Sequence, residues 1–427
     1  MADKSNEPAI EALGDFLVSR QADQFAFLSA LVRVNSENPP GNRAAMAAKL
    51  VELLEHLELS ANVEPPPNDT EAKNESKRPG APAPQFLTID MAFGDKPDSG
   101  PKIALATHTD TPPAGSGWTR DPQGAEIEGG QIYGRGVSDG KGDLAAYVFA
   151  ALALNKCSAG LNGRVQLRVS LDSRDILPGV RADFAVVPGG AKAIGTTATG
   201  VLTLEVEIND INTPASVPNA GADAVEASAN VLAALYDHRD SLSKRSSDVV
   251  GIGAPTLVVP RIQGGEGALT VPNQVKLIID RRLLPEEDAA QVVSEITNIV
   301  GRAVVAIPGV VCKVRRLCHL PAIVPNDAVE PLLSVLRREG EQVVGEPLAT
   351  YGTACETPAL LYAGAGVPVV MYGAGAVGLE ECVATRADEA LDLDDVRVAT
   401  LVLARTLANL LSSTGADDTV QGASIDP

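Results

Sequence analysis

The 427-residue chain contains few aromatic and histidine residues, since aromatics make up 3% of it and there are four histidines. Its five cysteines are scattered, and no pair has the CxxC spacing of a zinc knuckle or a disulfide framework. No apolar run approaches the ~18 residues that would cross a bilayer. The polar, acidic start, MADKSNEPAIEALGD, lacks the features of a signal peptide. We therefore expect a cytoplasmic protein with no membrane partner.

Positive charge is also scarce, because 35 Lys and Arg residues face 55 Asp and Glu residues and leave a net charge of −20. No run of basic residues is longer than two. A chain with this balance repels phosphate backbones, so nucleic acid is not an expected partner. The hydrophobic fraction of 45% excludes disorder of the whole chain, and the length allows two or three domains.

The residues that are present follow two different periods. Apolar residues at intervals of three and four predict helices near the N-terminus, with a break near Arg20, whereas β-rich runs predict strands from residue 85 onward. Strands that alternate with helices indicate an α/β domain. The Pro-rich, charged segment 64–84 is predicted to be a mobile loop. The expected helices lie at 10–34, 43–59 and 140–156, and the expected strands at 85–93, 102–108, 164–172 and 183–188.

A second unit is expected over residues 199–312. Its patterns follow the order strand, helix, strand, strand, helix (βαββα), which suits a small antiparallel sheet with two helices on one face. The α/β style returns afterwards, so a larger domain of residues 1–198 and 313–427 is interrupted by a smaller α+β domain. The smaller domain's elements are expected at 201–208, 220–238, 255–262, 274–284 and 286–300, and the later elements at 327–344, 367–373 and 394–411.

His108, Asp110 and Asp139 form the most informative group of side chains. His108 ends a predicted strand, Asp110 follows two residues later, and Asp139 opens a glycine-rich turn into a helix. Side chains at a strand's carboxyl end and at a helix start project into one crevice in open α/β sheets. Imidazole and carboxylate suit a divalent ion, with Asp110 placed to hold the second ring nitrogen of His108. A structural histidine beside tight turns is the alternative, and this pattern leaves both open.

The segment around these residues resembles the family of zinc-dependent aminoacylases, acetylornithine deacetylases, succinyl-diaminopimelate desuccinylases and carboxypeptidase G. The family's hallmark is HxD, then Trp, GRG, a bridging Asp and Lys-Gly. The likeness extends from about residue 25 to 411 and includes VNSENPPGN, DRRLLPEED and YGTACETPALL. It implies a large zinc-peptidase-like domain with a mostly parallel central sheet, interrupted by a ferredoxin-like lid and dimerisation domain. It also implies a homodimer formed through residues 199–312.

The resemblance implies two zinc ions, a general base and a lid histidine, but this chain departs from that pattern. His108 matches the first histidine ligand, and Asp139 matches the aspartate that bridges the ions. The remaining positions carry residues unsuited to their roles, with Ser173 at the general base, Pro214 at the lid histidine, and Arg174, Gly189 and Thr385 at the other metal ligands. Two protein ligands hold zinc poorly. We therefore expect a dismantled metal centre, no cofactor and little hydrolysis.

Further matches concern substrate binding and charge. Arg282 matches the family's arginine for the substrate carboxylate, and Glu356 lies in a segment similar to the CTEAP of acetylornithine deacetylases. Without zinc, the buried charge of Asp139 needs another partner. We expect Arg174 to reach into the former metal cavity and pair with Asp139. The alternative is a solvated Arg174 on a shortened loop.

Three functions remain open at this point, and whether the chain is an enzyme is one of the open questions. The first is a catalytically silent homologue with a binding or structural role. The second is a hydrolase of N-acyl amino acids or peptides with a rebuilt one-metal or cysteine-containing site, for which zinc would be the cofactor. The third is a module that binds a small amino-acid-like ligand. The residues available for a rebuilt site are Cys355, Cys382, Glu356, Glu380 and Glu381.

Overall fold

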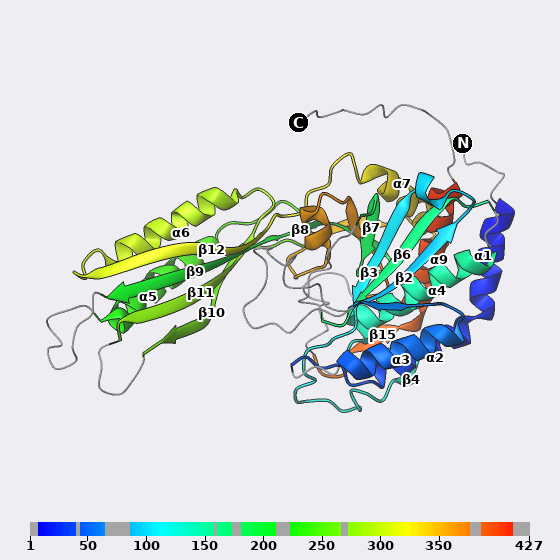
Figure 1. Ribbon diagram of the computed structural model, residues 1–427, viewed down its shortest axis with the longest axis horizontal. Coiled ribbons are helices and arrows are strands. Elements are labelled where there is room, and N and C mark those ends of the chain that lie inside the picture. The colour runs from blue at the N-terminus through cyan, green and yellow to red at the C-terminus, as the bar shows by residue number, and fades with distance from the viewer. Residues whose placement is uncertain are drawn as a thin grey trace.

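The computed structural model describes residues 7–39, 43–64, 86–157, 160–172, 181–210, 223–265, 272–375 and 386–412. Figure 1 shows two bodies side by side, a large domain that contains the first and last helices and a smaller domain from the middle of the chain. Apart from residue 64, the loop expected at 64–84 lies outside the described residues.

An eight-stranded sheet forms the centre of the large domain. In spatial order its strands are β1 (Asn62–Glu64), β2 (Phe86–Phe93), β6 (Gly163–Ser170), β3 (Lys102–His108), β7 (Phe184–Val187), β14 (Val369–Met371), β8 (Ala193–Ala198) and β13 (Ala349–Thr353). The four strands β6, β3, β7 and β14 run parallel to one another, and β8 is parallel to β13. β1, β2 and the contact between β14 and β8 are antiparallel. The predicted α/β class with a mostly parallel sheet is confirmed.

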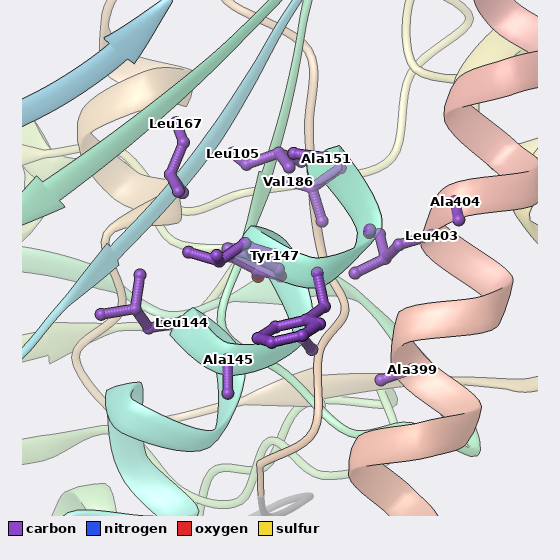
Figure 2. Packing of buried hydrophobic residues seen from close by; sticks show 14 of the residues in the cluster. Leu105, Leu144, Ala145, Tyr147, Ala151, Leu167, Val186, Ala399, Leu403 and Ala404 are labelled. Atoms are coloured by element: carbon purple, nitrogen blue, oxygen red, sulfur yellow. The ribbon is translucent and has the colours of Figure 1, made fainter. Parts of the chain in front are cut away.

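Most of the helices pack on one face of this sheet. They are α1 (Glu7–Ser19), α2 (Gln21–Val32), α3 (Arg43–His56), α4 (Gly142–Cys157), α7 (Glu330–Val344) and α9 (Leu393–Ser412), while α8 (Ala359–Gly364) contributes to a second core on the other face. The break expected near Arg20 separates α1 from α2. Figure 2 shows α4 between the strands, which contribute Leu105 and Leu167, and α9, which contributes Leu403. α4 is buried on all sides from Gly142 to Leu154, and its residues there are apolar except for Asp143 and the hydroxyl of Tyr147.

The smaller domain is a four-stranded antiparallel sheet with two helices. Its elements are β9 (Gly200–Asp210), α5 (Ala224–Leu242), β10 (Thr256–Gly264), β11 (Gln274–Leu283), α6 (Ala289–Val304) and β12 (Val310–Leu320), and the strand order is β10-β11-β9-β12. Alternate residues of β11 are buried, which is the pattern of a sheet covered on one face. The five expected elements are present. β12 was not predicted, because no residue of this edge strand is fully buried, and it extends past residue 312.

Two smaller features position the site. A three-stranded sheet, β15 (Ala390–Asp392), β5 (Gln131–Tyr133) and β4 (Glu126–Glu128), brings the segment before α9 next to the residues before Asp139. The turn η2 (Val137–Lys141) then leads into α4 and contains Asp139. Among the described helices, none has both the length and the hydropathy to cross a membrane.

The two domains are joined by contacts besides the connecting chain. The turn 249–252 of the smaller domain lies on β13, where the Gly352 amide donates to the Val250 carbonyl at 2.7 Å. Gly251 has φ +89°, and a Cβ there would lie 2.1 Å from the Gly352 carbonyl oxygen, so this approach requires glycine. At the connecting strands, the Thr199 amide donates to the Thr353 carbonyl at 3.0 Å.

Candidate functional site

The structure brings His108, Asp110 and Asp139 together at the carboxyl end of β3. His108 Nδ1 lies 3.2 Å from Asp110 Oδ1, and His108 Nε2 lies 3.3 Å from Asp139 Oδ1. The His108 and Asp110 side chains are 10% and 9% exposed, and that of Asp139 is 39% exposed. The imidazole is therefore held between two carboxylates, one on each ring nitrogen.

The two carboxylates also decide the protonation of His108. Burial disfavours a charged imidazole, but Asp139 and Asp110 outweigh it and raise the pKa of His108 well above its usual 6.5. A histidine must be deprotonated at the nitrogen that binds a metal ion. A zinc ion at His108 would therefore have to displace a proton that Asp139 stabilises.

Gly140 allows the turn with Asp139 to reach His108. Its φ is +90°, and a Cβ at this position would lie 2.4 Å from the His108 carbonyl oxygen. The hydroxyl of Thr107 donates to the Gly140 carbonyl at 3.0 Å and ties the turn to β3. A side chain at residue 140 would push Asp139 away from the imidazole.

A buried ion pair between Arg135 and Glu389 fixes the turn that contains Asp139. Arg135 is 2% exposed and Glu389 is 0% exposed, and Arg135 Nη1 donates to Glu389 Oε2 at 3.2 Å. The Gly136 amide also donates to Oε2, and the Ser138 amide and hydroxyl donate to Oε1, at 2.8 to 2.9 Å. The guanidinium of Arg135 also lies over the Trp118 ring, 5.0 Å from its centroid. This Arg135–Glu389 pair was not predicted from the sequence, although both segments that carry it, GRG and ADE, were part of the family resemblance.

The position expected to correspond to the family's third ligand, Gly189, has no room for a side chain. Gly189 follows β7, and its carbonyl accepts from the Gly375 amide at 2.9 Å. A Cβ at Gly189 would lie 2.5 Å from the Met371 carbonyl carbon and 2.7 Å from the Tyr372 nitrogen. The backbone after β14 therefore occupies the space that a ligand side chain would need.

Arg282 and Glu356, both expected to bind substrate, lie beside each other. Arg282 is near the end of β11, and its Nη2 lies 3.4 Å from Glu356 Oε2, while its Nε lies 3.0 Å from Asp280 Oδ1. The pair joins the smaller domain to the segment after β13. The buried Nη1 of Arg282 has no hydrogen-bond partner among the described residues.

Several predicted site residues fall outside the part of the chain that the structure describes. They are Ser173, Arg174, Pro214, Glu380, Glu381, Cys382 and Thr385. The expected pairing of Arg174 with Asp139 therefore stays a prediction. Within the described ranges, no three His, Cys, Asp or Glu side chains are grouped so that they could hold a metal ion. Among the described residues, His108 and Asp139 are two donors where an ordinary zinc site has three or four, so these residues alone do not complete a zinc site.

Comparison with known proteins identifies the smaller domain. Residues 196–307 match the M20 peptidase dimerisation domain. The chain is 27% identical to a succinyl-diaminopimelate desuccinylase of Xanthomonas oryzae over 239 residues. The aligned residues cover 50% of this chain and 61% of that enzyme. An acetylornithine deacetylase of Edwardsiella ictaluri is 27% identical over 291 residues, which cover 64% of this chain and 72% of that enzyme. The match to the desuccinylase thus spans less than two thirds of its length.

Solved structures share the fold of nearly the whole chain. An M20 family metallo-carboxypeptidase of Sulfolobus solfataricus has a TM-score of 0.65 at 19% identity, covering 91% of this chain and 99% of that one. Human carnosine dipeptidase 1 has a TM-score of 0.63 at 16% identity, covering 94% and 99%. At these identities the likeness shows the fold, and together with the dimerisation domain it confirms the resemblance found in the sequence.

Proposed function

We propose that this chain, which has the M20 peptidase fold and carries that family's dimerisation domain, is a catalytically silent homologue of zinc-dependent amide hydrolases. One observation carries the proposal: a Cβ at Gly189 would lie 2.5 Å from the Met371 carbonyl carbon, so a third ligand has no space at this position. Loss of a ligand by substitution alone would leave a cavity that a later substitution could refill. Here the Met371–Tyr372 backbone fills the place that a side chain at residue 189 would need.

The remnant ligands support the same proposal. His108 and Asp139, which would each contribute to a metal ion, bind one another instead at 3.3 Å. The pKa of His108 is raised by its carboxylate neighbours in spite of its burial, so its imidazole is stabilised as a cation. A proton on His108 thereby supplies positive charge beside Asp139, which is the charge that a metal ion supplies in an active centre.

A small amino-acid-like ligand is the partner that we propose for the cleft. Arg282 holds Glu356 across the two domains at 3.4 Å, and its Nη1 is buried without a partner among the described residues. A ligand carboxylate offers two oxygens to a guanidinium and could replace Glu356, whose side chain is 48% exposed. A purely structural role predicts no such exchange of carboxylates.

Metal analysis of the native protein tests the silent-homologue proposal most directly. The protein is purified with zinc in every buffer, its metal content is measured by mass spectrometry, and N-acyl amino acids and dipeptides are offered as substrates. We expect well below one zinc ion per chain and no turnover. Two tightly held divalent ions, or turnover that a chelator abolishes, would show that the site is active in a rebuilt form. Activity that depends on Glu356 or Cys382 would identify that form.

Ligand binding is tested by thermal shift against a panel of amino acids and N-acyl amino acids. We expect a rise in Tm that Arg282→Met abolishes. Arg315→Met is the matched control, because Arg315 lies on β12 of the same domain and pairs with Glu205 at 2.8 Å on an exposed surface. A shift that both variants retain would rule out Arg282 as the binding group and leave a structural role.

We also propose a homodimer formed through residues 199–312. The match to a dimerisation domain over residues 196–307 supports it. Val225 and Tyr236 on α5, and Val258 and Ile262 on β10, are large apolar side chains with 37–56% exposure. Light scattering coupled to gel filtration should give twice the chain mass, and Tyr236→Glu should shift it toward the monomer. A monomeric wild-type protein would exclude this assembly.

A further inference from the structure

Asp143 lies at the first turn of α4, the helix drawn in Figure 2 between the sheet and α9, and its side chain is fully buried. An acidic residue at a helix start is common, because it interacts favourably with the helix dipole while it stays in solvent. Asp143 differs, because it is removed from water and no cation is hydrogen bonded to it among the described residues.

Backbone amides from three separate segments donate to this carboxylate. The Ala374 amide donates to Asp143 Oδ1 at 2.9 Å, and the Gly140 amide donates to Oδ2 at 3.3 Å. The Gly189 amide is the third donor. Gly140 follows Asp139, Gly189 follows β7, and Ala374 follows β14, so the carboxylate joins the turn of the remnant site to the ends of two strands.

Close packing around the carboxylate shows that these segments are shaped to it. A Cβ at Gly373 would lie 1.9 Å from Asp143 Oδ1. A Cβ at Gly375 would lie 2.7 Å from the Ser138 carbonyl oxygen and 3.3 Å from Asp143 Oδ2. The segments are also bonded to each other, since the Gly375 amide donates to the Gly189 carbonyl at 2.9 Å. The absence of side chains at Gly373 and Gly375 thus lets this backbone segment come close to the Asp143 carboxylate.

The charge of Asp143 agrees with this geometry. Burial, and to a smaller extent the charge of Asp139, raise its pKa, and the amides of Gly140, Gly189 and Ala374 lower it, so that the balance raises the pKa to about 6. Three N–H donors therefore offset part of the cost of burying the charge. The hydroxyl of Tyr147, one turn along α4, donates to the Tyr372 carbonyl at 2.8 Å and is not a partner of the carboxylate.

We infer that Asp143 is the positioning residue of the remnant site, a buried anion that gathers the Gly140, Gly189 and Ala374 amides and holds the Asp139 turn against β7 and β14 without a metal ion. The inference deepens the proposed function and rests on it in one respect, because it takes the metal-free arrangement as the working state. It also explains why position 189 is closed, since the amide of Gly189 is drawn toward Asp143 rather than toward a ligand site.

Hydrogen exchange on the full-length protein tests this inference. In Asp143→Asn, which keeps the size of the side chain but replaces one acceptor oxygen by a donor, peptides that cover 137–144, 186–192 and 370–376 should exchange about tenfold faster. Asp143→Ala should raise the exchange of all three further. Glu339→Gln is the matched control, because Glu339 is an equally buried carboxylate that pairs with Arg405 between α7 and α9. It should leave these three peptides unchanged.

A second measurement separates a positioning role from a general loss of stability. The chain has four histidines, so ¹⁵N-labelled imidazole signals can be assigned by substitution. The His108 signals should move in Asp143→Asn and stay in place in Glu339→Gln. The inference is overturned if the three peptides of Asp143→Asn exchange at the wild-type rate, or if the turn 137–144 alone responds. If Asp143→Ala does not fold, Asp143→Asn decides. Zinc content and turnover of the wild-type protein test the proposed function separately from these results.

Discussion

The candidate site has two walls that are held together in different ways: the first is formed by the end of β3 and the turn with Asp139, and the second by the segments after β7 and β14. On the first wall, side chains do the holding: His108 lies between two carboxylates, and Glu389 accepts four hydrogen bonds from the residues around Arg135 and Ser138. On the second wall, the backbone does the holding, because Gly189 and Gly373 come so close to their neighbours that neither has room for a Cβ. The first wall therefore carries the acidic side chains and the histidine, whereas the described part of the second is held by main-chain contacts.

This difference shows two ways of packing one site. Clustered carboxylates need a counter-charge, and His108, whose pKa is raised, and the guanidinium of Arg135 supply it on the first wall. On the second wall, main chain fills the space beside Gly189, and the carboxylate of Asp143 accepts the Ala374 amide.

Removing the charge of Glu389 should have the largest effect. Glu389→Gln removes the buried carboxylate that pairs with the 2%-exposed Arg135 and turns one accepting oxygen into a donor that faces amide groups. Breaking a buried pair in this way costs about 3–5 kcal/mol, which calorimetry should detect as a large fall in Tm. Glu126→Gln is the control, since Glu126 is 49% exposed beside Arg120 and should change stability by less than about 1 kcal/mol. Equal effects of the two variants would contradict a stabilising role of the Arg135–Glu389 pair.

Adding a methyl group to the second wall by Gly189→Ala should have the next largest effect on stability. Gly189→Ala forces the Met371 backbone to move, and overpacking of this kind costs about 1–3 kcal/mol. Gly301→Ala provides the matched control, because no atom lies within 4 Å of a Cβ at Gly301, inside α6. Alanine there should stabilise the helix by up to about 1 kcal/mol. A Gly189→Ala protein as stable as the wild type would show that the wall is open and would reopen the case for a third ligand.

The smallest effect, and the most specific one, concerns the protonation of His108. Its pKa in the folded protein is above its usual 6.5, so its contribution to stability is complete below pH 6.5 and is lost as the pH rises through the folded value. His108→Gln should therefore lower stability at pH 6 by about 1–2 kcal/mol and by less at pH 9. Denaturant titrations of both proteins at the two pH values measure this. A penalty that grows with pH would mean that His108 is neutral and available to a metal ion.

Local patterns were sufficient to predict much of this molecule. The β3 strand with His108 at its end, the turn with Asp139 and the helix after it lie within about 50 residues of sequence, and their order predicted that the two side chains lie close together. The same holds for the break between α1 and α2. The absence of a side chain at Gly189 was also visible, although whether its space was empty or filled depends on Met371, far away in the chain.

The features that escaped prediction depend on distant partners or on burial. Glu389 and Arg135 are separated by 254 residues, and nothing local distinguishes Glu389 from a surface carboxylate. Asp143 has the appearance of an ordinary acidic residue at a helix start, and its role depends on two loops that arrive from β7 and β14. β12 was missed because charged residues alternate with half-buried ones on an edge strand.

The contact between Gly251 and β13 has a consequence for self-association. β13 is an outer strand of the eight-stranded sheet, and an uncovered outer strand can pair with the same strand of another molecule. The Val250 carbonyl already accepts the Gly352 amide, so the smaller domain shields this border of the sheet. At the opposite border, β1 has three residues. Among the described strands, neither border of this sheet is therefore a long template for fibre growth, and a variant that detaches the 249–252 turn should aggregate before it loses its secondary structure.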